Sequence, residues 1–147
     1  MPVSYEIDPR RNRITTRCIG DTTLSEVLEH FDLLEREPNR PPHLDVLLDL
    51  TEQTNLPTAQ QIQAAASRIG MAKWMIDFRA CAIVVNRDAL FGMLRMFEVF
   101  AHPHFERLRV FRDMSQARTW LESRNGSGLG SGNGNGNPRE TQPPSAA

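Results

Sequence analysis

The chain has 147 residues, a formal net charge of −1 and 39% hydrophobic residues, which suits one globular domain able to bury a core. Basic and acidic residues are interspersed without a basic stripe, so no nucleic-acid partner is expected. The N-terminus lacks the basic and apolar regions of a signal peptide, and no apolar run reaches the ~20 residues that span a bilayer, so no integral membrane segment is expected. From residue 124 onward Gly, Ser, Asn and Pro dominate, which predicts a folded domain over 1–123 and a disordered tail over 124–147.

The first part of the domain is typical of a β-hairpin followed by a helix. Apolar and polar residues alternate over 3–7, and a second strand-like run spans 14–19 after a turn-forming segment. These two runs predict an antiparallel pair. Thr23 and Glu26 then have the spacing of a capping box, which predicts that a helix begins directly after Thr23.

The remainder of the domain alternates strands and helices. Residues 44–50 are apolar on both faces, which is typical of a central strand covered on both sides. Thr58 and Gln61 repeat the capping-box spacing at the start of a second helix, and Ser115 is expected to cap the last one. Between them we expect a strand over 80–85, a helix over 88–102 and a short strand over 108–111. The order β-β-α-β-α-β-α-β-α predicts an α/β fold with a mostly parallel four- to five-stranded sheet, helices on both faces and right-handed crossovers.

This order, with the buried strand at 44–50 and the closing segment at 110–121, resembles the STAS-like (SpoIIAA-like) family of small bacterial proteins, most of them uncharacterised. The superfamily groups anti-sigma factor antagonists with CRAL-TRIO lipid-transfer domains on a similar fold, and the resemblance covers residues 3–122. It implies a bacterial, cytoplasmic, non-catalytic module that regulates or binds a protein partner. The alternative that it implies is a carrier of an apolar small molecule or lipid.

The segment between the central strand and the second helix holds a candidate switch. In the antagonists, a serine here is phosphorylated to control partner binding, and in this chain Asn55 and Thr58 stand where Asp and Ser are expected, just after Thr54. Free backbone N–H groups at a helix N-terminus also suit an anion. Thr54, Asn55 and Thr58 therefore form the candidate switch or anion site. The alternative is that Thr58 is only the N-cap of its helix.

The helix expected at 88–102 is apolar nearly all round, apart from one narrow polar stripe formed by Arg95, Glu98 and His102. Met96 and Phe100, opposite that stripe, are expected to pack on the sheet. Other large apolar residues fall beside the stripe, where water is expected, and the end of the second helix extends the same surface. This surface predicts an interface with a protein partner or with a second copy of the chain in a homodimer, unless neighbouring loops cover it. Its candidate residues are Phe91, Leu94, Val99, Trp74 and Met75.

No catalytic motif is present, so enzymatic activity is not expected. His102 and His104 are a close pair, but no third ligand stands at metal-binding spacing, so neither a metal nor another cofactor is expected. Cys18 and Cys81 are expected to be buried, reduced thiols, and His30 is expected at the surface. If the chain carries an apolar ligand, we expect that ligand between the sheet and the third helix.

Overall fold

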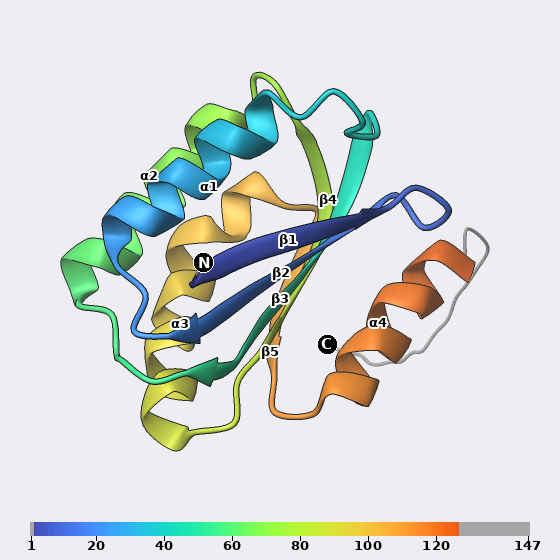
Figure 1. The fold of residues 1–147 in the computed structure, drawn as a ribbon. Coiled ribbons are helices and arrows are strands. Elements are labelled where there is room, and N and C mark those ends of the chain that lie inside the picture. The colour runs from blue at the N-terminus through green and yellow to red at the C-terminus, as the bar shows by residue number, and fades with distance from the viewer. Residues whose placement is uncertain (1, 127–147) are drawn as a thin grey trace.

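The computed structural model describes the backbone of residues 2–126 and the side chains of residues 2–123. This part of the chain forms a five-stranded sheet and four α-helices (Figure 1). The strands are β1 (Val3–Asp8), β2 (Arg13–Gly20), β3 (His43–Gln53), β4 (Asp77–Val84) and β5 (Arg107–Phe111). The helices are α1 (Leu24–Glu35), α2 (Ala59–Ala72), α3 (Asp88–Ala101) and α4 (Met114–Gly126), with a short 3₁₀ helix, η1 (His102–His104), after α3.

The five strands lie in the sheet in the same order as in the chain. β1 pairs antiparallel with β2, whereas β2 to β5 are parallel to one another. Parallel strands joined in sequence by crossovers of one hand receive their helices on one side. Accordingly α1, α2 and α3 cover one face of the sheet and α4 covers the other (Figure 1). The predicted class and order of elements are confirmed, and the sheet is mixed because of the β1–β2 hairpin.

Strand β3 divides the core into two parts. Val46, Leu48 and Leu50 face the layer of α1, α2 and α3, whereas Leu47 packs with Leu121 beneath α4. Alternate side chains of a strand point to opposite faces, so a strand covered on both sides is apolar at nearly every position. This is why residues 44–50 lack the alternation seen in β1.

The helix starts follow the capping pattern at α1 and α2 but not at α4. The Thr58 hydroxyl accepts a hydrogen bond from the N–H of Gln61 at 3.1 Å, and the Gln61 side chain accepts one from the N–H of Thr58 at 2.8 Å. Thr23 forms the same capping box in front of α1. The expectation that Ser115 caps the last helix is wrong. Asp113 accepts hydrogen bonds from the N–H of Gln116 and from the Ser115 hydroxyl, because α4 begins at Met114, two residues earlier than a cap at Ser115 implies.

Helix α4 continues to Gly126, three residues beyond the expected end of the domain at residue 123. The rest of that segment, residues 127–147, lies outside the described residues. No helix in the described part of the chain is long and apolar enough to cross a membrane.

Candidate functional site

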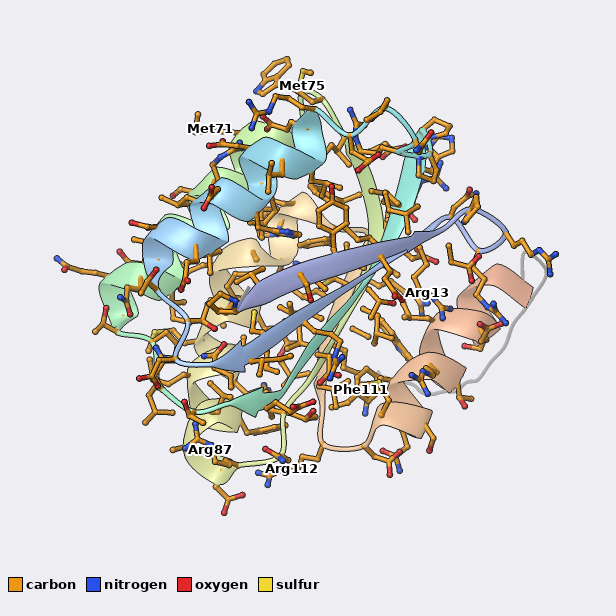
Figure 2. The ribbon with its side chains drawn as sticks, in the orientation of Figure 1. Arg13, Met71, Met75, Arg87, Phe111 and Arg112 are labelled. Carbon is orange, nitrogen blue, oxygen red and sulfur yellow. The ribbon has the colours of Figure 1, made fainter. Side chains whose placement is uncertain are left out.

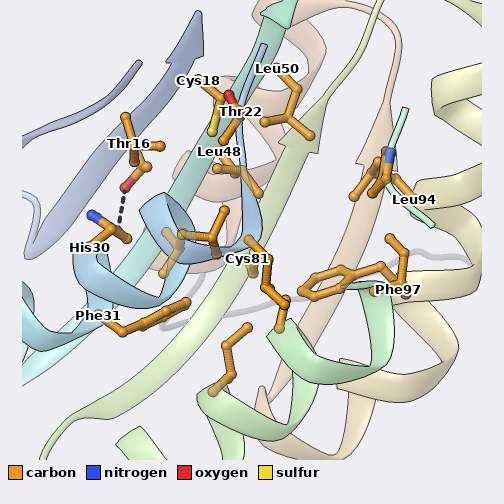
Figure 3. Close-up of a pocket in the computed structure, with 18 of the residues that line it drawn as sticks. Thr16, Cys18, Thr22, His30, Phe31, Leu48, Leu50, Cys81, Leu94 and Phe97 are labelled. Carbon is orange, nitrogen blue, oxygen red and sulfur yellow. Dashed lines mark hydrogen bonds between the residues drawn. The ribbon is translucent and has the colours of Figure 1, made fainter. Parts of the chain in front are cut away.

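An apolar cavity of about 150 Å³ lies between the sheet and the helical layer (Figure 3). Alternate residues of β2 and β3 form its floor. Most of its helical lining comes from α1 and α2, whereas α3, the helix expected to cover such a space, contributes two side chains. The principal lining residues are Thr16, Cys18, Val46, Leu48 and Leu50 from the strands and Val27, His30, Phe31, Ile62, Ala65, Leu94 and Phe97 from the helices.

Short side chains explain why the layers leave this space. Protein interiors are normally packed as densely as organic crystals, so an internal space of this size needs a local cause. Thr16 and Cys18 on β2, and Ala65 on α2, occupy positions of the lining where a Leu or Phe would project into the cavity. Sequence periodicity identifies which residues face the core, but it does not report whether their combined volume fills it.

His30 is the first polar group of the cavity. The prediction that His30 lies at the surface is wrong, because its side chain is buried. Its side chain comes from α1, and its Nε2 lies 3.4 Å from the Thr16 hydroxyl oxygen (Figure 3). The rings of Tyr5 and Phe31 pack edge-on against it, each with a centroid separation of 5.4 Å. Burial lowers the pKa of His30 to about 4, because the charged imidazolium would lose its hydration. His30 is therefore a neutral hydrogen-bonding group at neutral pH.

Thr22 and Cys18 form a second polar point of the cavity wall (Figure 3). The Thr22 side chain is buried, and its hydroxyl oxygen has no hydrogen-bond partner of normal geometry among the described residues. Burial raises the pKa of the Cys18 thiol to about 11, an effect that the neighbouring Thr22 hydroxyl partly offsets. Since a thiol is only a weak hydrogen-bonding group, the Thr22 hydroxyl remains without a strong partner.

No Asp, Glu, Lys or Arg lines the cavity in the part of the chain that the structure describes. With His30 neutral and Cys18 protonated, the wall carries hydrogen-bonding groups but no charge at neutral pH. A charged ligand would lose its hydration here without gaining an opposite charge, which is costly. The arrangement suits a neutral, mostly apolar molecule.

The candidate switch residues lie at the rim of the same region. Thr54 donates its hydroxyl hydrogen bond to Asp21 at 2.7 Å, and the Asn55 side chain bridges to the backbone N–H and carbonyl of Thr22 at 3.0 and 2.8 Å. Thr58 caps α2 and is exposed. Thr54 and Asn55 thus fasten the β2–α1 connection to the β3–α2 segment. The switch itself stays a prediction.

The candidate interface residues do not form one surface. Leu94 is buried, at 4% exposure, and lines the cavity, so its expected place at the surface is wrong. Met96 and Phe100, which were expected to pack on the sheet, are exposed instead. The buried face of α3 is a stripe at i, i+4, i+7 and i+11, and a helix that is apolar nearly all round does not reveal which stripe faces inward. That stripe comprises Leu90, Leu94, Phe97 and Ala101.

The remaining interface candidates differ in how exposed their side chains are. Phe91 is half-buried, with the guanidinium of Arg112 4.3 Å from its ring centroid. Val99, Trp74 and Met75 are exposed, Trp74 at 90%. Met75 lies with Met71 at the end of α2 (Figure 2), and Trp74 follows that helix. The exposed candidates therefore lie just after the end of α2 and on α3.

The histidines of η1 are His102 and His104, the close pair noted in the sequence. Among the described residues, no group of three His, Cys, Asp or Glu side chains could hold a metal ion. His104 packs onto α2 at Gly70, where an added Cβ would lie 2.8 Å from His104 Cε1. A side chain at position 70 would therefore require the His104 ring to shift.

Comparison with known proteins identifies the fold type of this chain. No family model matches the chain, and no curated protein sequence matches it. Among solved structures, it is similar to an uncharacterised protein of the DUF3478 family from Shewanella loihica PV-4, described as having a SpoIIAA-like fold, with a TM-score of 0.57. The chain has a SpoIIAA-like fold. The two sequences are 19% identical, and the match covers 81% of this chain and 93% of the other.

Proposed function

We propose that this protein is a non-catalytic binding protein for a small, neutral, apolar molecule, held in the cavity between the sheet and helices α1 and α2. The observation that carries the proposal is the cavity of about 150 Å³ with an apolar, uncharged lining. Engineered apolar cavities of about this volume stay dry and take up benzene or xenon. Burial of apolar atoms from water provides the driving force for such binding.

The volume limits the size of the ligand. Pockets for drug-sized molecules span about 300–1,000 Å³, so a space of about 150 Å³ suits a molecule near benzene in size. A long acyl chain would require the helices to move apart. The proposal therefore favours a small molecule over the lipid that the family resemblance includes.

The N-terminal ends of α1 and α2 offer an access route. The lining residues Leu24, Val27, Pro57 and Gln61 are only half-buried, and they lie at or just before the first turns of these two helices. Thr22, in contrast, is buried deeper in the same wall. A ligand that passes between the helix ends would reach the apolar floor of β2 and β3.

A co-purification experiment tests the proposal. The full chain is purified under native conditions, extracted with organic solvent, and the extract is analysed by gas chromatography and mass spectrometry. We expect a small neutral compound from the wild type. Ala65→Phe, which places a ring in the cavity, should lose that compound, whereas Ala59→Phe at the exposed first residue of α2 should retain it. Equal amounts from both variants would contradict binding in the cavity.

Protein interaction is the second candidate function, and the exposed end of α2 favours it. Trp74, Met71 and Met75 are exposed at 90%, 65% and 59%, and methionine and tryptophan suit adaptable apolar contacts. If this surface joins two copies of the chain, the wild type should sediment as a dimer and Trp74→Ser as a monomer. A monomeric wild type would contradict self-association.

A further inference from the structure

The Thr22 hydroxyl is the polar group of the cavity that lacks a strong partner. It is one of three buried side-chain polar atoms in the described residues without a hydrogen bond, the other two being the Nε atoms of Arg13 and Arg107. Only Thr22 lines the apolar cavity. A buried hydroxyl that is left unsatisfied is costly, so any bound group that bonds to it recovers that cost.

The backbone holds this hydroxyl in a fixed place. The N–H of Thr22 donates to Asn55 Oδ1 at 3.0 Å, and Asn55 Nδ2 donates to the carbonyl of Thr22 at 2.8 Å. A residue fixed at both of its backbone groups loses little freedom when a ligand binds, which favours a directional contact. Asn55 thereby acts as a positioning residue for Thr22.

The other polar groups of the cavity are already engaged. His30 pairs with Thr16, and the Gln53 side chain donates to the carbonyl of Asn55 at 3.1 Å. These partners leave Thr22 as the point at which a ligand oxygen gains most.

We infer that the ligand is a neutral molecule of about benzene size that carries one hydroxyl group, and that this hydroxyl forms a hydrogen bond with Thr22. The inference rests on the proposed function and adds the chemical class of the ligand. A hydroxyl suits Thr22 because each partner can both donate and accept. Charged groups are disfavoured because the lining residues offer no opposite charge.

Phenol and toluene test the inference, because they differ in whether a hydroxyl or a methyl group is attached to the same ring. The affinity of each is measured by calorimetric titration of the full chain, as wild type and as Thr22→Val, which replaces the hydroxyl with a methyl group of similar shape. The cost of dehydrating phenol is the same for both proteins and cancels in the comparison. We expect the ratio of phenol affinity to toluene affinity to fall about tenfold in Thr22→Val, as for the loss of one hydrogen bond to a buried group.

Two further variants serve as controls. Thr22→Ser keeps the hydroxyl and should keep the wild-type ratio of phenol affinity to toluene affinity. If Thr22→Val folds poorly, Thr22→Ala replaces it in the comparison and should lower that ratio in the same way. Toluene binding with an unchanged ratio in the variants without the hydroxyl would overturn the inference and leave the proposed function standing. Failure of the wild type to bind either compound would overturn both.

Discussion

The buried His30 should make the domain less stable as the pH falls below neutrality. Its pKa is about 4 in the folded protein, against 6.5 for an ordinary histidine. Between these two values the unfolded chain binds the proton and the folded protein does not, so stability falls as the pH is lowered from about 6.5 to about 4. The difference of about 2.5 pH units corresponds to about 3 kcal/mol in total, and to about 2 kcal/mol between pH 7.5 and pH 5.

Urea unfolding at about pH 7.5 and about pH 5 measures this effect. The wild type should lose about 2 kcal/mol more than His30→Gln over this interval, because the variant has no proton to take up at that position. The lowered pKa of His104 acts in the same direction but is present in both proteins, so it cancels. Tyr5, which packs on His30, has a raised pKa and stays neutral throughout.

His102→Gln is the matched control, since His102 is exposed. It should show the pH dependence of the wild type. If His30→Gln loses as much stability as the wild type between the two pH values, His30 is not buried as a neutral group and the account of the cavity wall is wrong.

Three further pairs of substitutions test the helix caps and the orientation of α3, with stability measured by urea or thermal unfolding and the interaction of Thr58→Glu measured by pull-down. Thr58→Ala should lower the free energy of unfolding by about 1 kcal/mol, because α2 loses its cap. If Thr58 is a phosphorylation switch, Thr58→Glu should abolish a partner interaction that Thr58→Ala keeps. Asp113→Ala should cost about 1 kcal/mol and Ser115→Ala much less, and the reverse order would show that Ser115 is the cap of α4. Leu94→Ala should cost about 2–5 kcal/mol, and Val99→Ala, at an exposed site, less than about 0.5 kcal/mol; similar costs would contradict the orientation of α3.

The order of the elements could be predicted because each carries a local pattern. The alternation over residues 3–7 and the capping boxes at Thr23 and Thr58 depend only on near neighbours, and the structure confirms the elements they begin. The orientation of α3 could not be predicted. With apolar residues on most sides, the choice between the stripe of Leu94 and that of Met96 depends on how the whole helix packs against α2 and the sheet.

The cavity depends on volumes that no periodic pattern reports. Thr16 and Cys18 alternate with exposed or half-exposed residues along β2, so the sequence could predict that their side chains point inward. It could not predict that the side chains opposite them leave a cavity. His30 falls within a helix whose apolar positions are clear, three residues after Val27 and four before Leu34. That spacing places it on the inner face of α1, and it was the available indication that this histidine is buried.

Methyl-resolved NMR during a toluene titration tests the central claim most directly, because it shows where an apolar molecule binds. The methyl groups of Val46, Leu48 and Ile62, which line the cavity, should shift in a saturable way. Those of Leu121 and Val84, in the separate cluster beneath α4, should not. The Ala65→Phe variant should lose the shifts, and equal shifts in both clusters, or none in either, would contradict the proposed binding site.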